Sequence, residues 1–457
     1  MQTIKSGDDR TVKIIGRKSL DKDSDYRLSL FTYMYSENNI YIIQNTLTFE
    51  ITELTSAEWE ALQKIKNATA TGSYIAENGL EPLVAKHYIV KNKNNDTAQY
   101  QQICFLLKTM LGRKKGYSTY VIFPTTSCNA RCVYCYEEGY PVKTMSVETA
   151  LHLVDFICET RHDGEVKLRW FGGEPLSAKN IITQICTELH NRGISYKSTM
   201  ITNASLMTKE LAHEAKELWH LNKVQISLDG TKEDYAIRKN YYSPDRYNYD
   251  VVMQAVHFLA DEGIKVKLRV NVDFGNIAGI EGFLNDIKAE FGDMNNISLY
   301  LAPLYQVQKS DECLMLYKEI FRLTDYQKEI GIPYTSSDNE TSHLRANHCM
   351  ADIPDKSIVI TPEGIFNNCE HLPEFNTWGN IFDGVTNADR YKELCAQSAI
   401  DTQCAKCPFL PECTPFYKNG CPGWFEKCYE YHCMRTEHML HELLKSVKAI
   451  PHKEQAT

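Results

Sequence analysis

The sequence predicts an α/β protein: a partial (β/α)6 barrel flanked by a small N-terminal α+β domain and a cysteine-rich C-terminal domain. Three observations predict this architecture. Between residues 117 and 331, short apolar runs alternate with amphipathic segments of helical period. The residues before 117 instead place strand-like runs ahead of short helices. Nine of the sixteen cysteines fall between Cys349 and Cys433. We therefore expect three domains, at 1–112, 113–340 and 341–457.

The central domain is predicted to contain a parallel sheet, because apolar strands that alternate with helices are buried on both faces. Strands are expected at 117–123, 166–171, 196–201, 224–228, 266–272 and 297–301, and helices at 147–161, 181–191, 209–219, 249–262, 281–290 and 314–330. Ligands of such sheets gather at the carboxyl ends of the strands. We therefore expect the functional residues at that edge.

The N-terminal domain is predicted to be winged-helix-like. Strand-like runs at 28–35 and 40–51 are joined by a polar turn, and Thr55 with Glu58 forms a capping box that opens a helix. A short helix and a strand-like run at 87–90 follow. The alternative is a packing extension of the central domain.

Composition excludes several classes of protein. The chain has 457 residues, a net charge of −9 and no basic stripe, which argues against nucleic-acid binding. No apolar run reaches the length of a membrane span, and the N-terminus lacks the apolar core of a secretory signal. We therefore expect a cytoplasmic protein whose cysteines serve as metal ligands rather than as disulfides.

Three cysteines directly after the first barrel strand carry the strongest chemical signal. Cys128, Cys132 and Cys135 lie in Cys-Asn-Ala-Arg-Cys-Val-Tyr-Cys. A structural zinc and a fully protein-ligated cubane both take four ligands, so three thiolates leave one iron of a 4Fe–4S cluster open. The alternative is a zinc loop that takes a fourth ligand from elsewhere in the chain.

This loop resembles that of the radical S-adenosylmethionine (SAM) enzymes, in which the amino and carboxylate groups of SAM chelate the open iron. The resemblance implies that a low-potential electron enters the cluster and splits SAM into methionine and a 5′-deoxyadenosyl radical. That radical removes a hydrogen atom from unactivated carbon. Tyr134 matches the family position of an aromatic side chain that packs against the SAM adenine.

Further residues match the SAM site of this family. After the second strand, the motif Gly172-Gly173-Glu174 resembles the family's Gly-Gly-Glu-Pro, which binds the SAM amino group, and paired glycines allow close backbone approach. Weaker matches lie at or after the ends of later strands: Asn203, Ser227, Asp229 and Arg238. Each of these also has a plainer explanation, such as a turn or a solvated charge.

The C-terminal cysteines resemble the SPASM extension of radical SAM peptide maturases, which holds two auxiliary 4Fe–4S clusters. The resemblance assigns Cys404, Cys407, Cys413 and Cys433 to an outer cluster and Cys349, Cys369 and Cys421 to an inner one. Cys421 stands eight residues after Cys413 rather than the usual four, and no second cysteine follows Cys349 closely. Either Cys428 completes the inner cluster, as we expect, or one inner iron stays open to substrate. A zinc ribbon is the alternative for the outer set.

These features predict a radical SAM peptide maturase with three 4Fe–4S clusters. Its partners would be a ribosomally made precursor peptide with a leader and a low-potential donor of the flavodoxin or ferredoxin type. The product would be a thioether or C–C crosslink. The N-terminal domain, residues 1–112, resembles the leader-recognition domains fused to such maturases, which bind the leader as an added strand. The alternatives are a sulfatase-maturating, formylglycine-forming enzyme or another SPASM oxidoreductase, and a non-catalytic iron–sulfur electron carrier. The sequence assigns no catalytic acid or base.

Overall fold

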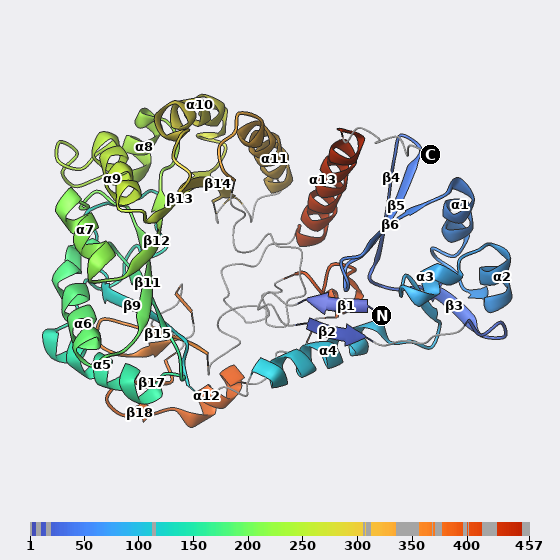
Figure 1. Cartoon of the computed structure of the whole chain (residues 1–457), viewed down its shortest axis with the longest axis horizontal. Helices are drawn as coiled ribbons and strands as arrows, with labels where there is room; N and C mark the ends of the chain where they lie inside the picture. The colour runs from blue at the N-terminus through green and yellow to red at the C-terminus, as the bar shows by residue number, and fades with distance from the viewer. Residues whose placement is uncertain are drawn as a thin grey trace, which may run out of the picture. The chain divides into compact units, whose positions relative to one another are not determined.

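The computed structural model describes residues 2–5, 11–14, 20–111, 116–304, 307, 312–334, 356–367, 369–370, 377–395, 400, 402–413 and 427–449. They form two compact units (Figure 1). Unit 1 lies within residues 1–113 and 398–457, and unit 2 lies within 114–339 and 349–397. The predicted C-terminal domain, 341–457, thus contributes to both units, and the division into three domains stays a prediction.

Unit 2 is built on the predicted parallel sheet. Its strands are β9 (Thr119–Thr125), β10 (Val166–Gly172), β11 (Tyr196–Thr202), β12 (Leu221–Ser227), β13 (Lys265–Val272) and β14 (Ile297–Pro303). Each pairs in parallel with its neighbour in chain order, from β9 at one side to β14 at the other. The six strands expected from the sequence are confirmed.

Helices cover the outer face of this curved sheet (Figure 1). They are α5 (Val147–Thr160), α6 (Lys179–Asn191), α7 (Lys209–Glu217), α8 (Lys232–Lys239), α9 (Tyr249–Asp261), α10 (Ile280–Phe291) and α11 (Cys313–Glu329). Ser146, Thr208 and Asn248 cap α5, α7 and α9 by accepting from backbone N–H groups, which satisfies donors that a helix start leaves free. The large apolar core lies between these helices and the outward side chains of the strands.

Helix α8 and strands β15 and β16 of unit 2 were not expected from the sequence. Helix α8 lies between β12 and α9, and it carries Arg238. Strand β15 (Ser357–Ile360) pairs in parallel with β9, and β16 (Phe366–Asn367) pairs with β15 in antiparallel fashion. The sheet therefore has eight strands among the described residues, and part of the cysteine-rich region extends the barrel. The short pair β17 (Gly379–Asn380) and β18 (Gly384–Val385) and helix α12 (Ala388–Cys395) follow.

Unit 1 contains the N-terminal α+β elements. Strands β4 (Thr32–Glu37), β5 (Ile40–Asn45) and β6 (Ile51–Leu54) form one antiparallel sheet, and β3 (Asp25–Leu28), β7 (Ala70–Thr71) and β8 (Ile89–Lys91) form another. The predicted strand 28–35 is therefore two strands of different sheets, and 40–51 is divided at Phe49, whose φ is 60°. Helix α1 (Ser56–Lys64) begins with the predicted Thr55–Glu58 capping box. Helices α2 (Gly72–Glu77) and α3 (Glu81–Ala85) and the strand pair β1 (Gln2–Lys5) and β2 (Thr11–Ile14) complete this part.

The C-terminal segment belongs to the same unit. Leu410 packs in one apolar cluster with Phe31, Leu47 and Leu107, the last from α4 (Asp96–Leu111). Helix α13 (Cys428–Ala449) lies beside β4 and is joined to it by His441 Nδ1, 2.8 Å from Glu37. The described helices include none with the length and apolar character that a membrane span requires.

Candidate functional site

The loop that carries Cys128, Cys132 and Cys135 is fixed by backbone hydrogen bonds to the end of α8. Arg131 N donates to the carbonyls of Lys239 and Asn240 at 3.2 and 3.0 Å, and Val133 N donates to that of Arg238 at 3.1 Å. The loop therefore takes its position from a helix about a hundred residues later in the chain.

The three loop thiols lie close enough together for their charges to interact. Burial raises the pKa of Cys128 to about 12, and the charges of Glu174, Cys132 and Cys135 act in the same direction. Among the described side chains, no three Cys, His, Asp or Glu residues converge on a point for a single ion. A cubane does not need such convergence, because its thiolates bind different irons.

The Gly172-Gly173 pair makes room for the start of this loop. A Cβ on Gly172, whose φ is +112°, would lie 2.4 Å from the carbonyl oxygen of Thr125, and one on Gly173 would lie 2.4 Å from that of Ser127. Both distances are shorter than real Cβ contacts, so β10 can end beside the loop only with glycine at both positions. The backbone that Gly172 and Gly173 approach closely in the structure is thus the protein's own, at Thr125 and Ser127.

Glu174 is a fully buried carboxylate with no ion-pair partner among the described residues. Its Oε1 accepts from Thr202 Oγ1 at 2.6 Å and Leu176 N at 3.0 Å, and its Oε2 accepts from Asn203 N at 2.7 Å. A carboxylate has about four acceptor positions, so one remains on Oε2. Burial raises the pKa of Glu174, which these donors only partly offset. Such a group fits a bound ammonium.

Asn203 braces the cysteine loop from the end of β11. Its Nδ2 donates to Asn129 Oδ1 at 2.9 Å and lies 4.0 Å from Cys128 Sγ, while its Oδ1 accepts from Ser205. These contacts show how Asn203 supports Cys128. Its predicted contact with SAM stays a prediction.

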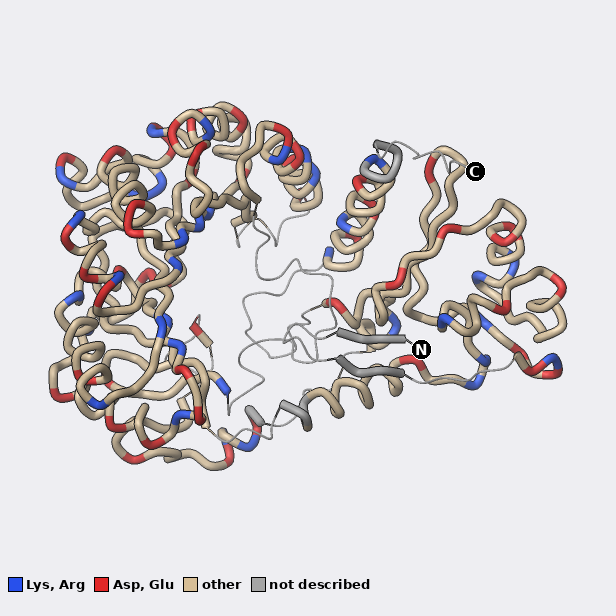
Figure 2. The backbone as a smooth tube through the Cα atoms, viewed as in Figure 1, with Lys and Arg blue, Asp and Glu red and all other residues tan. Residues whose placement is uncertain are grey.

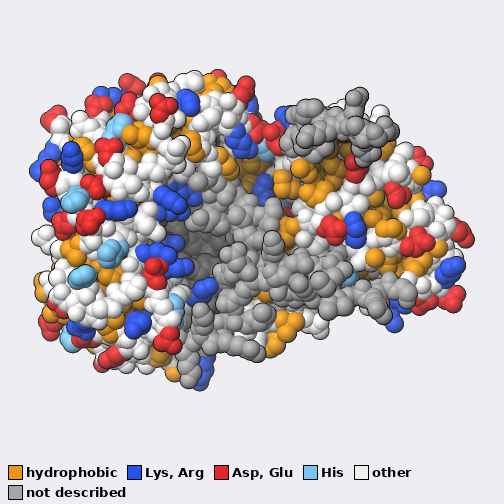
Figure 3. All heavy atoms as spheres, in the orientation of Figure 1, with side chains coloured by type: hydrophobic (Ala, Val, Ile, Leu, Met, Phe, Trp, Pro, Cys, Tyr) orange, Lys and Arg blue, Asp and Glu red, His pale blue; other side chains and the backbone are white. Residues whose placement is uncertain are grey.

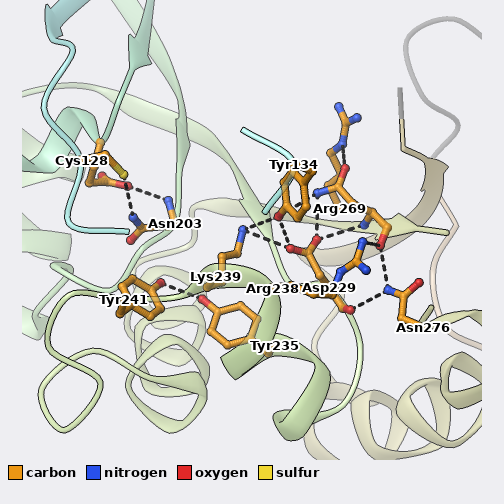
Figure 4. A network of polar contacts seen from close by, with 12 residues as sticks. Cys128, Tyr134, Asn203, Asp229, Tyr235, Arg238, Lys239, Tyr241, Arg269 and Asn276 are labelled. Atoms are coloured by element: carbon orange, nitrogen blue, oxygen red, sulfur yellow. Dashed lines mark hydrogen bonds and ion pairs between the residues drawn. The ribbon is translucent and has the colours of Figure 1, made fainter. Parts of the chain in front are cut away.

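Asp229 lies at the centre of a buried polar network (Figure 4). Its Oδ2 accepts from the Tyr134 hydroxyl and lies 3.2 Å from Lys239 Nζ, and its Oδ1 accepts from the backbone and side-chain amides of Asn271 at 3.1 and 2.8 Å. Four donors occupy its four acceptor positions. Asp229 therefore holds Tyr134 in place. Its predicted contact with SAM stays a prediction.

Charge in this network is balanced by Lys239. Burial opposes ionisation of Asp229, but Lys239, Tyr134 and Asn271 outweigh it, so the pKa of Asp229 is lowered. Burial likewise opposes the charge on Lys239, whose pKa the Asp229 carboxylate nevertheless raises well above its usual value. The Lys239 ammonium also donates to the Tyr134 hydroxyl at 2.9 Å.

Arg238 lies beside the same ring. Its guanidinium carbon is 5.5 Å from the Tyr134 ring centroid, and its Nη1 donates to both carboxylate oxygens of Asp273 at 3.1 and 3.0 Å. Its Nε is buried and has no hydrogen-bond partner among the described residues. A buried donor without a partner fits a site for an acidic ligand group. Ser227 is half-buried at the end of β12 and is not part of the network.

Neither Lys239 nor Asn271 was assigned a role from the sequence. Asn276 was missed as well: its Nδ2 donates to the carbonyls of Asp229 and Asn271 at 2.8 and 2.9 Å. A lysine ten residues after a strand-end aspartate gives no local signal, because the turn into α8 brings the two together. The positions of Asn271 near the carboxyl end of β13 and of Asn276 shortly after that strand were the only indication in the sequence.

The described C-terminal cysteines lie in both units. Cys369 is in unit 2, and its neighbour Glu370 forms an ion pair with Arg169 of β10 at 3.2 Å. Cys404, Cys407, Cys413, Cys428 and Cys433 are in unit 1. Burial and then the charges of Cys428, Cys404 and Cys433 raise the pKa of Cys407 to about 12, and burial and then Cys428 raise that of Cys413.

Cys428 therefore lies near the set assigned to the outer cluster. Cys349 and Cys421, assigned to the inner cluster, lie outside the described residues. The ligand sets of both auxiliary clusters stay predictions.

Residues 122–285 match the family model of the Radical SAM superfamily. The matched segment contains the cysteine loop, Glu174 and the Asp229 network. The chain therefore contains a radical SAM domain, and it is an enzyme.

Two curated relatives show how far the similarity extends. The antilisterial bacteriocin subtilosin biosynthesis protein AlbA of Bacillus subtilis is 25% identical over 65% of this chain and 66% of its own length. The Fe-coproporphyrin III synthase of Methanosarcina barkeri is 26% identical over 36% of this chain and 40% of its own length. The names of these two relatives describe different functions, so the domain alone does not identify a substrate.

Two solved structures share the fold. SuiB of Streptococcus suis, bound to S-adenosylmethionine, matches with a TM-score of 0.51 and 16% identity over 88% of this chain and 99% of SuiB. Native anSMEcpe with bound AdoMet matches with a TM-score of 0.55 and 16% identity over 73% of this chain and all of anSMEcpe. At these identities the likeness is one of fold.

The residues of the site fit a 4Fe–4S cluster and SAM. The three loop thiols could serve as cluster ligands, the carboxylate of Glu174 fits the SAM ammonium, and the unpartnered Nε of Arg238 fits an acidic group. Because thiolates are the ligands, loading the cluster releases protons from these thiols.

Proposed function

We propose that this enzyme modifies a ribosomally made precursor peptide by radical SAM chemistry and installs a thioether or C–C crosslink. When bound, the cluster and SAM supply one-electron reductive cleavage of SAM and, through it, removal of a hydrogen atom from an unactivated carbon. The observation that carries the proposal is the three-thiol loop beside the buried, unpaired carboxylate of Glu174, within a domain matched by the Radical SAM superfamily.

The peptide as substrate is supported by the relatives. AlbA is described as a bacteriocin biosynthesis protein, and one SuiB structure, which matches with a TM-score of 0.51, is described as bound to the precursor peptide SuiA. SuiB also covers more of this chain than anSMEcpe does, 88% against 73%. A low-potential flavodoxin or ferredoxin is the proposed electron donor.

The chain's own residues have defined roles in this proposal. Cys128, Cys132 and Cys135 would hold the cluster, Glu174 would bind the SAM ammonium, and Arg238 would bind an acidic group. Tyr134, held by Asp229 and Lys239, would present its ring to the adenine. Gly172 and Gly173 allow the cysteine loop to approach β10 closely enough for these groups to meet.

Unit 1 is proposed to recognise the leader of the precursor. In the sheet β4-β5-β6, strand β6 is an edge, and Ile51 and Glu53 on it are exposed. An extended peptide can add to such an edge through backbone hydrogen bonds.

The test is anaerobic reconstitution followed by reduction with dithionite. We expect about twelve irons, four per cluster, and release of 5′-deoxyadenosine and methionine. Replacing Cys128, Cys132 and Cys135 together with Ala should remove about four irons and abolish SAM cleavage. If a short cysteine-containing peptide is encoded beside the gene, co-expression with it should give a product that lacks two hydrogen atoms per crosslink. Retained cleavage in the triple variant would refute the site assignment.

Sulfatase maturation, which the resemblance of the C-terminal cysteines also implies, is the second candidate. Conversion of a cysteine or serine to formylglycine in a sulfatase peptide, with no crosslink in the precursor, would favour it.

A further inference from the structure

The parallel strands of unit 2 carry positive charge only. In β9 to β14 there is no Asp or Glu, whereas basic residues occur on four adjacent strands: Lys167 and Arg169 on β10, Lys197 on β11, Lys223 on β12, and Lys265, Lys267 and Arg269 on β13. The chain as a whole has more acidic than basic residues, 59 against 50. The basic strands therefore run against the overall charge.

Alternation along the strands assigns these basic side chains to the concave face of the sheet. On β10, Leu168 and Trp170 lie in the core beneath the helices, so Lys167 and Arg169 point to the other face, as does Phe171. Phe171 belongs to a separate apolar cluster with Phe123 on that face. Figure 2 marks Lys and Arg in blue along these strands, and Figure 3 shows blue side chains on the concave side of the unit.

The same alternation holds on the neighbouring strands. Val224 and Ile226 of β12 and Leu268 and Val270 of β13 lie in the helix-covered core. Their neighbours on the concave face include Lys223, Lys267 and Arg269. Lys267 Nζ lies 4.5 Å from the ring centroid of Tyr300 on β14.

Few acidic side chains neutralise this face. Arg169 pairs with Glu370 at 3.2 Å, and Lys197 pairs with Glu165 at 2.5 Å. Lys167, Lys223 and Arg269 form no ion pair within the described part of the chain. A face lined by one sign of charge focuses the field and attracts ligands of the opposite sign.

Among these basic residues, Arg269 contacts the buried polar network centred on Asp229. Its Nε donates to Asn271 Oδ1 at 2.8 Å, and Asn271 in turn holds Asp229 and lies 3.4 Å from the Tyr134 hydroxyl. Figure 4 shows its guanidinium pointing away from this network. Its two terminal nitrogens have no partner among the described residues, so they can bind a carboxylate with two parallel hydrogen bonds.

We propose that the concave face binds an acidic segment of the peptide substrate, and that Arg269 holds a carboxylate of that segment beside the reacting position. This inference rests on the proposed function, because it names the chemistry of the peptide that the same site would take. The competing source of a carboxylate is SAM itself, and SAM binding separates the two.

The test uses the reconstituted holoenzyme with SAM and three synthetic peptides of equal length: (Gly-Glu)6, (Gly-Gln)6 and (Gly-Lys)6. We expect that only the glutamate peptide binds. Its affinity should fall as salt is added, because salt screens exposed charges. Arg269→Gln should weaken this binding about tenfold, and Arg269→Lys should weaken it less, because lysine keeps the charge but not the paired donors. The double variant Lys167→Gln/Lys223→Gln should weaken it about threefold.

The matched control is Lys209→Gln, which removes an exposed charge from the first turn of α7. Equal binding of the glutamate and glutamine peptides, or equal weakening by Lys209→Gln, would overturn the proposal. So would an Arg269→Gln variant that loses affinity for SAM and keeps affinity for the glutamate peptide, since SAM would then be the occupant.

The proposed function and this inference fail separately. If wild-type enzyme modifies its precursor but does not bind the glutamate peptide, the acidic segment is refuted and the proposed function stands. If it binds the glutamate peptide in the expected pattern but modifies no peptide, the carboxylate site stands and the proposed function is refuted.

Discussion

Lys239 Nζ and Asp229 Oδ2 lie 3.2 Å apart in an ion pair whose side chains are 3% and 0% exposed. The Tyr134 hydroxyl binds both partners, and the carbonyl of Lys239 accepts from Arg131 in the cysteine loop. The pair therefore joins the cysteine loop, helix α8 and the end of β12 at one buried point. In the proposed function, Asp229 and Lys239 position Tyr134 and the cysteine loop and do not bind the cofactor themselves.

Removing one partner of this pair should destabilise the protein strongly. Lys239→Met leaves the Asp229 carboxylate buried without its cation, and breaking a buried pair costs about 3–5 kcal/mol of unfolding free energy. Urea unfolding measures this loss. In wild type the pKa of Asp229 is lowered, so its contribution is present at neutral pH and is lost as the pH falls through that pKa. The difference between variant and wild type should therefore shrink in acid.

The control for Lys239→Met lies on the same helix. Lys232 pairs with Asp250, and both side chains are exposed, so Lys232→Met should change stability by about 0.5 kcal/mol or less. The double variant Asp229→Asn/Lys239→Met should recover part of the loss, because it buries no unpaired charge. Equal losses of unfolding free energy in Lys239→Met and Lys232→Met would show that the buried pair stabilises the protein no more than an exposed pair does.

Glu174 should make SAM binding depend on pH. Burial raises the pKa of this carboxyl, and binding of an ammonium requires its charged form, so the Kd for SAM should rise as the pH falls through the raised pKa. Calorimetry in buffers of different ionisation enthalpy would detect the proton released on binding.

Glu174→Gln should bind SAM about tenfold more weakly, with little pH dependence left. Glu159→Gln, on the exposed side of α5, is the matched control and should behave as wild type. An unchanged pH profile in Glu174→Gln would assign the proton to another group.

The strands and caps of the barrel could be predicted because their signals are local. Apolar runs such as 266–272 form strands wherever helices cover them, and Thr55 caps α1 with the Glu58 that follows three residues later. Helix α8 was not predicted because it has only eight residues and five of them are charged, which leaves few apolar positions from which a helical period could be recognised. The strand predicted at 28–35 was wrong because a turn at 29–31 sends β3 and β4 to different sheets.

Residues of the candidate site could be predicted from the sequence only where they lie in a motif with a known role. Cys128 and Glu174 lie in recognisable motifs. Lys239 does not, since a lysine at the end of a polar helix is ordinarily solvated, and only the folded chain shows it buried against Asp229. The basic concave face was not foreseen either, because the charges alternate with core residues and are spread over four strands.

The C-terminal cysteine segment should depend on the N-terminal elements for stability. Leu107 of α4 is fully buried in the cluster that contains Leu410, three residues after Cys407. Leu107→Ala should cost about 2–5 kcal/mol and lower the auxiliary iron content, while the iron of the Cys128 loop is kept. Iron analysis with electron paramagnetic resonance measures both.

The neighbouring residue gives the control for this prediction. Leu106 lies on the same helix and is 51% exposed, so Leu106→Ala should leave stability and iron content close to wild type. Deletion of residues 1–110 should likewise lower the auxiliary iron content. A loss of leader binding in that truncated protein must therefore be interpreted together with its loss of auxiliary iron. If Leu107→Ala kept its auxiliary iron, the C-terminal cysteine segment would not depend on the N-terminal elements for stability.

The sequence left open whether Cys428 is a ligand of an auxiliary cluster. It begins α13, and its charge is the first after burial to raise the pKa of both Cys407 and Cys413. If it is a ligand, Cys428→Ala should lose about four irons while SAM still binds at the Cys128 loop. Cys186→Ala, which removes a fully buried thiol in the core of unit 2, is the control and should keep all iron. Full iron content in Cys428→Ala would instead favour an inner cluster with an open iron. In that case the wild-type cluster spectrum should change when a cysteine-containing peptide is added, because the substrate thiolate would occupy the open position.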